Sequence, residues 1–231
     1  MILISDIDGC LTPGRFQPVD IPSMALFKEF IKKNNVFMVL ASGRSQAYME
    51  CLSQILGINT PYICENGAAI FAPKTGNYIY TFSKVNISKI KNSLELKFGA
   101  RVIYEPNKEF TISLRIDDAS FESIEREYEA VMDLLKDYRD IEITHSNSAI
   151  DIIPKGANKQ TALKFLCKNL GIKEEKLIGF GDSYNDLCFL DFCRLTGAPS
   201  NCCEDVAKAV NYKAKNEDIK GLLEFLNEIR T

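Results

Sequence analysis

The first third of the chain alternates between short apolar runs and stretches in which apolar residues recur at helical spacing. The runs predict buried strands at 1–7, 36–41 and 61–64, and the helical spacing predicts helices at 22–34 and 45–56. Because these strands are apolar throughout, both of their faces are expected to be covered. This order predicts a parallel sheet with helices on both sides.

The middle of the chain has a different order of elements. We predict a helix at 87–98, strands at 101–104 and 110–116, a helix at 121–138, and strands at 141–144 and 149–153. This order is typical of an α+β unit with an antiparallel sheet. Strand 110–116 alternates cleanly, so that its polar face carries Thr111, Ser113 and Arg115. A sheet with helices on one side only leaves such a face open.

The last third of the chain again alternates between apolar runs and stretches of helical spacing, as the first third does. The predicted elements are a helix at 159–170, a strand at 177–180, a helix at 185–190, a strand at 195–197 and a helix at 218–229. We therefore predict an α/β fold with a Rossmann-like parallel sheet. Its core domain is formed by residues 1–79 and 154–231, and residues 80–153 form an inserted α+β domain.

Composition and charge narrow the class of protein. The chain has 231 residues, of which 46% are hydrophobic and 26% charged, as in globular proteins and unlike disordered or coiled-coil chains. The net charge of −3 argues against a nucleic-acid partner, which requires a basic surface. No apolar run is long enough to cross a membrane, and the acidic start lacks the basic segment of a signal peptide. We expect a cytoplasmic protein, and the sequence makes no prediction of its oligomeric state.

The eight cysteines fit the same interpretation. They form no CxxC pair, and the chain has a single histidine, His145, so the sequence argues against a zinc site. We expect most of them to be small buried apolar residues. A redox role stays open only for the adjacent pair Cys202 and Cys203.

Polar side chains follow three of the predicted core strands. Asp6 and Asp8 stand at the end of the first, Ser42 and Gly43 follow the second, and residues 181–186 follow the strand at 177–180. The carboxyl ends of parallel strands share one edge of the sheet, where ligands bind. These segments are therefore expected to converge, although they are far apart in the chain.

The converging groups indicate phosphoryl transfer. The four carboxylates of Asp6, Asp8, Asp182 and Asp186 would repel one another without a cation, and oxygen ligands that leave room for a phosphate suit Mg²⁺. Ser42 and Gly43 offer a hydroxyl and backbone N–H groups to an anion, and Lys159 offers a positive charge. A carboxylate can attack phosphorus, and a second one two residues on can protonate the leaving oxygen and then activate water.

The sequence resembles the haloacid dehalogenase (HAD) superfamily. Residues 6–12 match its DxDGxLT signature, with Cys10 where the family usually has Thr. Three later segments are similar to its remaining motifs: residues 41–44, Lys159, and the GDxxxND segment at 181–186. The ENGA turn at 65–68 is similar to that of the Cof-type branch. The insertion resembles a C2-type cap, a layout shared with sucrose-phosphate phosphatases, mannosyl-3-phosphoglycerate phosphatases and archaeal phosphoglycolate phosphatases.

The resemblance implies a role for each matching residue. Asp6 is expected to be the nucleophile and a Mg²⁺ ligand, and Asp8 the general acid and base, with its backbone carbonyl on the metal. The other implied residues are Asp182 and Asp186 for the metal, and Ser42, Gly43, Lys159 and Asn185 for the phosphate.

The predicted activity is Mg²⁺-dependent hydrolysis of a small phosphorylated metabolite through an aspartyl-phosphate. A sugar phosphate and 2-phosphoglycolate are both open as substrates, and Thr111, Ser113 and Arg115 of the cap are candidates to recognise them. Two alternatives remain: a phosphomutase that interconverts hexose phosphates on the same fold, and a binding module without catalysis.

Overall fold

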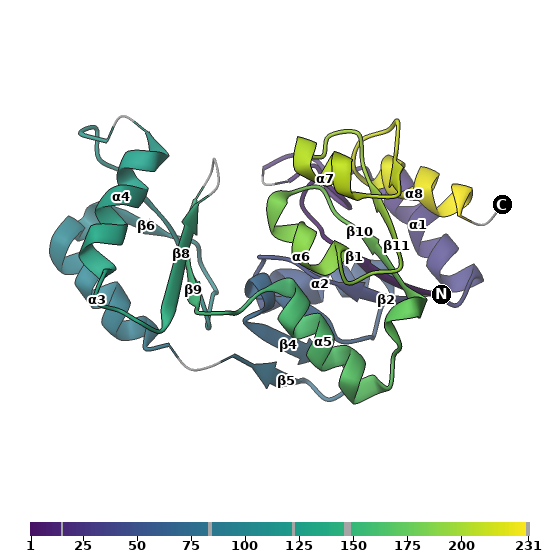
Figure 1. The fold of residues 1–231 in the computed structure, drawn as a ribbon, viewed down its shortest axis with the longest axis horizontal. Helices are drawn as coiled ribbons and strands as arrows, with labels where there is room; N and C mark the ends of the chain where they lie inside the picture. The colour runs from purple at the N-terminus through teal and green to yellow at the C-terminus, as the bar shows by residue number, and fades with distance from the viewer. Residues whose placement is uncertain (15, 83–84, 122, 146–148, 230–231) are drawn as a thin grey trace.

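The computed structural model describes residues 1–14, 16–82, 85–121, 123–145 and 149–229. Its core is a five-stranded sheet of order β12-β11-β10-β1-β2, in which every neighbouring pair is parallel (Figure 1). The strands are β1 (Ile2–Ser5), β2 (Phe37–Leu40), β10 (Leu177–Phe180), β11 (Leu195–Ala198) and β12 (Tyr212–Lys213). The prediction of an α/β fold with a parallel central sheet is confirmed.

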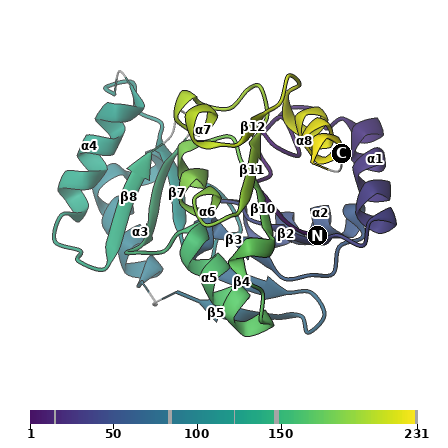
Figure 2. The same ribbon diagram turned by 45° about the vertical axis from the view of Figure 1, so that its right-hand side comes forward.

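Helices cover both faces of this sheet (Figure 2). They are α1 (Ile21–Lys33), α2 (Gln46–Leu56), α5 (Lys159–Leu170), α6 (Leu187–Leu190), α7 (Glu204–Ala209) and α8 (Asp218–Glu228). Leu3 of β1 packs in the cluster formed with α1, α2 and α8, whereas its neighbour Ile4 packs in the cluster with α5, α6 and α7. Successive strand residues point to opposite faces, and both faces are covered, which is why the core strands are largely apolar. Among the described helices, none has the length and apolar content needed to cross a bilayer.

The strand predicted at 61–64 forms, as β3 (Tyr62–Cys64), but most of its pairing is antiparallel. It belongs to a three-stranded sheet of order β3-β4-β5, with β4 (Ala69–Ala72) and β5 (Asn77–Thr81), and meets β2 through one parallel bridge between Ala41 and Ile63. The tight turn that reverses the chain after β3 is the 3-10 turn η1 (Glu65–Gly67).

The inserted segment forms a separate antiparallel sheet of order β6-β7-β9-β8. Its strands are β6 (Val102–Tyr104), β7 (Ile112–Ile116), β8 (Ile141–His145) and β9 (Ile150–Pro154), and its helices are α3 (Ile87–Phe98) and α4 (Ile124–Leu135). Both helices lie on the face of this sheet away from the core (Figure 1). We call this segment, residues 87–154, the cap.

Two predicted cap elements are shorter than the pattern indicated. The strand expected at 110–116 begins at Ile112, because the N–H groups of Phe110 and Thr111 bond to a side chain of the core. The helix expected at 121–138 spans only Ile124–Leu135. The remaining 3-10 turns are η2 (Gly99–Arg101), η3 (Glu174–Lys176) and η4 (Tyr184–Asp186).

Candidate active site

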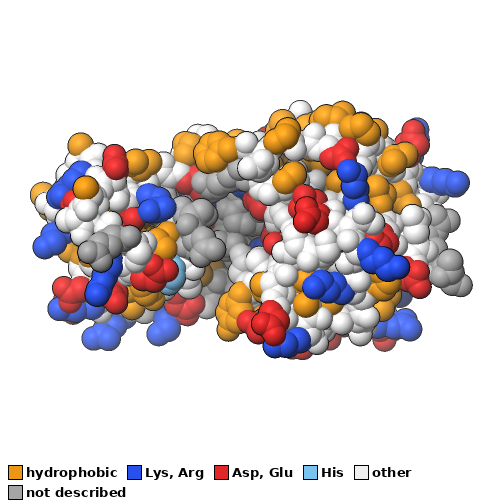
Figure 3. All heavy atoms as spheres, turned by 90° about the horizontal axis from the view of Figure 1, so that it is seen from above, with side chains coloured by type: hydrophobic (Ala, Val, Ile, Leu, Met, Phe, Trp, Pro, Cys, Tyr) orange, Lys and Arg blue, Asp and Glu red, His pale blue; other side chains and the backbone are white. Residues whose placement is uncertain are grey.

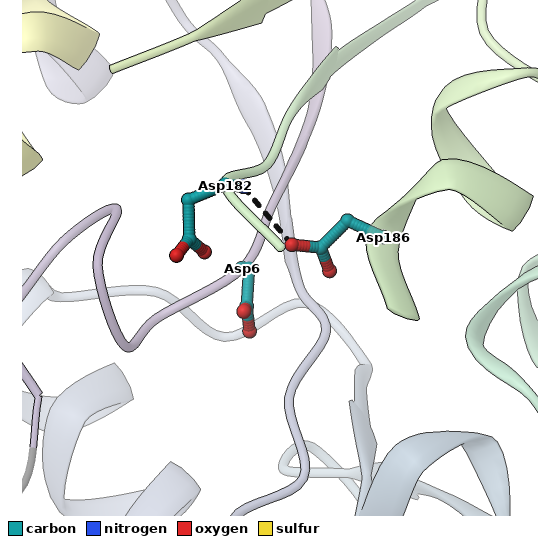
Figure 4. A group of neighbouring side chains, drawn as sticks. All are labelled: Asp6, Asp182 and Asp186. Carbon is teal, nitrogen blue, oxygen red and sulfur yellow. Dashed lines mark hydrogen bonds between the residues drawn. The ribbon is translucent and has the colours of Figure 1, made fainter. Parts of the chain in front are cut away.

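Three carboxylates gather at the carboxyl end of the central strands. β1 and β10 are neighbours in register, with Ser5 opposite Phe180, so Asp6 and Asp182 emerge side by side. Asp186 reaches the same place from η4, and one oxygen from each of the three lies within 4.8 Å of the others (Figure 4). Asp6 and Asp186 are buried, and Asp182 is partly exposed.

Lys159, the first residue of α5, is buried against this cluster. Its Nζ lies 3.0 Å from Asp6 Oδ1 and 2.7 Å from Asp186 Oδ1, and only 2% of its side chain is exposed. Although burial alone would lower it, the charges of Asp186 and Asp6 raise the pKa of Lys159, which keeps the ammonium charged. One ammonium offsets only one of three carboxylates, so the ionised cluster is doubly negative. An all-oxygen donor set of this charge fits Mg²⁺.

Two acids of the cluster, Asp6 and Asp182, resist ionisation in the absence of a cation. Burial, followed by the charge of Asp186, raises the pKa of Asp6 from 3.8 to about 7. Burial and the charge of Asp6 raise the pKa of Asp182 to about 8. A cation bound here replaces protons that these carboxylates would otherwise hold near neutral pH.

Asp186 organises the loop after β10. Its Oδ2 accepts hydrogen bonds from the N–H of Asp182 and of Ser183, both at 3.0 Å, and from Ser183 Oγ at 3.1 Å. Its Oδ1 accepts from Lys159. With both oxygens engaged, Asp186 fixes Asp182 and Lys159 relative to each other. Asn185 lies beside it with an exposed side chain that accepts from Ser183 Oγ at 2.6 Å.

The Asp8 side chain lies apart from the three-carboxylate cluster and is bound by Arg44. Arg44 Nε donates to Asp8 Oδ2 at 2.7 Å and Nη2 donates to Oδ1 at 2.5 Å. The guanidinium also stacks over the Tyr48 ring, 4.6 Å from its centroid. Arg44 stands in the second motif, but no role was predicted for it. The feature of the sequence that could have indicated a role is a charged residue directly after the predicted anion-binding loop.

Ser42 and Gly43 occupy the loop between β2 and α2. Ser42 is 1% exposed, and its Oγ accepts from Arg44 N at 3.3 Å. A Cβ at position 43 would lie 2.9 Å from Asn66 Oδ1, so the Asn66 side chain of η1 packs directly on this loop. The Asn66 Oδ1 atom is buried and has no hydrogen-bond partner among the described residues.

The three cap residues predicted to contact the substrate have different surroundings. Thr111 donates from its N–H and its hydroxyl to Glu65 Oε2, both at 2.8 Å. Arg115 pairs with Glu127 of α4, with Nη2 2.7 Å from Oε1. Ser113 bonds to Asp151 and Lys108 in a partly buried polar cluster that also includes Glu105.

A cleft of about 660 Å³ separates the core from the cap. Its walls come from Arg44 and Tyr48, from the cap residues 105–107, and from four residues that precede α1: Gly14, Phe16, Gln17 and Val19. Figure 3 shows the hollow between the two lobes. Arg44, which holds Asp8, lines this cleft, although no candidate catalytic carboxylate is among the lining residues. Glu105 stands on the opposite wall, a residue that the sequence analysis did not select.

Known proteins share both the sequence pattern and the fold. A model of the haloacid dehalogenase-like hydrolase family matches residues 3–142 and 110–226. A phosphoglycolate phosphatase of Methanopyrus kandleri is 26% identical, over 99% of this chain and 96% of that protein. A glucosyl-3-phosphoglycerate/mannosyl-3-phosphoglycerate phosphatase of Persephonella marina is 28% identical, over 82% and 81%. A crystal structure from Thermoplasma acidophilum superposes with a TM-score of 0.82 at 18% identity, covering 99% and 97% of the two chains.

Proposed function

Since this chain belongs to the haloacid dehalogenase-like hydrolase family, we propose that it is a phosphatase acting on a small phosphate monoester. The observation that carries the proposal is the position of Asp6, a buried carboxylate that contacts Lys159 and shares a site with Asp182 and Asp186. A nucleophilic carboxylate beside a fixed ammonium and a cation site is suited to attack a phosphoryl group.

The reaction has two displacements at phosphorus. In the first, a carboxylate oxygen of Asp6 bonds to phosphorus, the bond from phosphorus to the ester oxygen breaks, and Asp8 gives its proton to the leaving oxygen. In the second, Asp8 takes a proton from water, whose oxygen attacks the same phosphorus. The bond to Asp6 then breaks, and inorganic phosphate leaves with the enzyme restored.

Two groups of residues support these steps. The first group is proposed to bind the phosphoryl oxygens: Lys159, Ser42, the N–H of Gly43 and Asn185. The second group is proposed to form the Mg²⁺ site: Asp6, Asp182, Asp186 and the Asp8 backbone carbonyl. Asp186 acts through the loop that it holds. When bound, Mg²⁺ supplies positive charge against the phosphoryl oxygens.

Asp8 needs a fixed direction to transfer protons in both steps. The paired hydrogen bonds from Arg44 set that direction, because a forked guanidinium restrains a carboxylate in its own plane. The carboxylate is about one-third exposed and Arg44 lines the cleft, so the leaving group has access to it.

The proposed substrate is a phosphorylated small metabolite. The relatives named above act, by their names, on phosphoglycolate and on glucosyl- or mannosyl-3-phosphoglycerate. A cleft of about 660 Å³ has room for either kind of leaving group. We therefore keep 2-phosphoglycolate and sugar phosphates as the two substrate classes to be tested.

Phosphate release from a panel of such compounds tests the proposal. We expect release that requires Mg²⁺, is strongest for one class and is abolished in Asp6→Asn. Interconversion of hexose phosphates without release would show a phosphomutase instead. Binding of phosphorylated compounds with no turnover of any would contradict catalysis.

A further inference from the structure

The side chain of Glu65 extends from the η1 turn of the core, and its carboxylate is buried against the cap. Its Oε1 accepts from the N–H of Glu109, and its Oε2 accepts from the N–H of Phe110 and from the N–H and hydroxyl of Thr111. All four bonds are 2.8–2.9 Å long, and Glu65 is 1% exposed. Hydrogen bonds to an ionised carboxylate are among the stronger kinds. One core side chain therefore holds three successive cap residues.

The backbone of the same turn is fixed on the loop that carries Arg44. The N–H of Glu65 donates to Arg44 O at 3.1 Å, and the N–H of Asn66 donates to Ser42 O at 3.0 Å. Both turn residues have positive φ angles, 49° for Glu65 and 56° for Asn66, which is uncommon outside glycine. Such a conformation persists only where its surroundings impose it.

The third residue of the turn packs on the start of α5. A Cβ at Gly67 would lie 2.1 Å from the carbonyl oxygen of Asn158 and 2.8 Å from the backbone nitrogen of Lys159. The φ angle of Gly67 is 93°, so both its conformation and its contact require glycine. The turn thus contacts the backbone of the residue whose ammonium holds Asp6.

From these contacts we propose that Glu65 is a positioning residue, which sets the cap segment 105–111 against the core loop that carries Arg44 and the start of α5, which carries Lys159. The segment continues from the held residues 109–111 to Glu105 on the cleft wall, and Lys108 fixes it to Ser113 and Asp151 of the cap sheet. A leaving group bound by the cap is then held at a set distance from Asp6 and Asp8. This role rests on the proposed phosphatase activity.

Glu65→Gln tests the role with little change in shape. It replaces one acceptor oxygen by an NH₂ group that faces backbone N–H donors. The control is Glu109→Gln, which removes a carboxylate from the same segment; that side chain accepts only an exposed bond from the Tyr78 hydroxyl among the hydrogen bonds described. Thr111→Val, which removes one of the four bonds to Glu65, is a milder second variant in case Glu65→Gln does not fold.

Two readouts distinguish positioning from general support of the fold. For the best metabolite substrate, kcat/KM is expected to fall about 100-fold in Glu65→Gln, the size of effect that a misplacement of about 1 Å produces. Turnover of p-nitrophenyl phosphate, whose leaving group needs no cap contact, is expected to stay close to that of the wild type. Hydrogen exchange is expected to accelerate at amides 109–111 and to stay slow in β1 and β10.

The proposal is overturned if kcat/KM and amide exchange are unchanged in Glu65→Gln, or if both substrates lose activity equally. Equal loss would mean that Glu65 supports the core site rather than the placement of the cap. If the wild type releases phosphate from no compound, the proposed function fails, whereas amide exchange still tests the contact between Glu65 and the cap.

Discussion

Arg44 holds Asp8 by two parallel hydrogen bonds of 2.7 and 2.5 Å, and the two residues come from different strand ends. Asp8 follows β1 and Arg44 follows β2, strands that pair in parallel with Ser5 opposite Leu40. The adjacency of the strands therefore brings the proposed proton-transfer group to its guanidinium partner. Lysine cannot reproduce this geometry, because its ammonium is a single point charge.

We expect Arg44→Ala to lower kcat by about 100-fold, the lower end of what general acid–base catalysis contributes, and Arg44→Lys by about 10-fold. The loss should be smaller for aryl phosphates, whose leaving groups need little protonation. Steady-state rates across leaving groups of graded basicity measure this dependence. Arg126→Ala is a matched control, since Arg126 pairs with Glu129 on the surface of α4. An equal loss for every leaving group would contradict a role through Asp8.

Asp6→Asn is expected to abolish turnover without loss of stability. The Asp6 carboxylate is costly to ionise in its buried position, as its raised pKa of about 7 indicates, and Asp186 still pairs with Lys159 after the change. The melting temperature of the metal-free variant should equal or exceed that of the wild type near neutral pH. Calorimetry together with phosphate release measures both effects. A variant that is active, or one that unfolds early, would contradict this account of Asp6.

Without Mg²⁺, stability is expected to fall as the pH rises. Asp6 and Asp182 have folded pKa values of about 7 and 8, above their ordinary value of 3.8. The folded chain therefore binds more protons than the unfolded chain between about pH 4 and 8, and raising the pH removes this stabilisation. Below about pH 4 both states are protonated and the contribution is fully present.

The stabilisation that Mg²⁺ provides is expected to increase as the pH rises. It requires the ionised carboxylates, so the rise in melting temperature on adding it is expected to be larger at pH 8 than at pH 6. Thermal unfolding with a chelator and with Mg²⁺ at several pH values measures both trends, and Asp182→Asn should flatten each of them. A stabilisation by Mg²⁺ that is independent of pH would place the cation elsewhere.

Lys159→Met is expected to destabilise the protein strongly as well as to inactivate it. Removing one partner of a buried ion pair typically costs about 3–5 kcal/mol, because the remaining charges are left without compensation. Here Asp6 and Asp186 would lose the cation that both contact. Urea unfolding at neutral pH measures the cost. Lys136→Met, which removes an exposed pair with Asp133 in the cap, should unfold close to the wild type.

The parts of the site that the sequence predicted are those that parallel pairing brings together. Asp6 and Asp182 each follow an apolar run, and adjacent parallel strands must end at one edge, so their meeting could be inferred without coordinates. The position of Lys159 could be inferred in a similar way, because it begins a predicted helix. The local pattern of each element carried this information.

Contacts between side chains of distant segments could not be inferred in this way. Arg115 lies on the polar side of an alternating strand, but its partner Glu127 stands on the helix that follows, and no pattern in the sequence links the two. Thr111 precedes its strand because Glu65, 46 positions earlier in the chain, captures its N–H. The hairpin β4–β5 was not predicted, although β4 is an apolar run; the partner strand β5 is exposed at alternate positions and contributes little to the core.

The order of the central sheet also determines when the site can form as the chain is made. β1 lies between β2 and β10, and its register pairs residue 2 with residue 177. The strand that bears Asp6 therefore keeps one open edge until most of the chain has emerged from the ribosome. The strands of the cap sheet all lie within residues 102–154, so they can pair with one another earlier. Contacts between residues distant in sequence form slowly, so the cap has time to fold before the pocket beneath it exists.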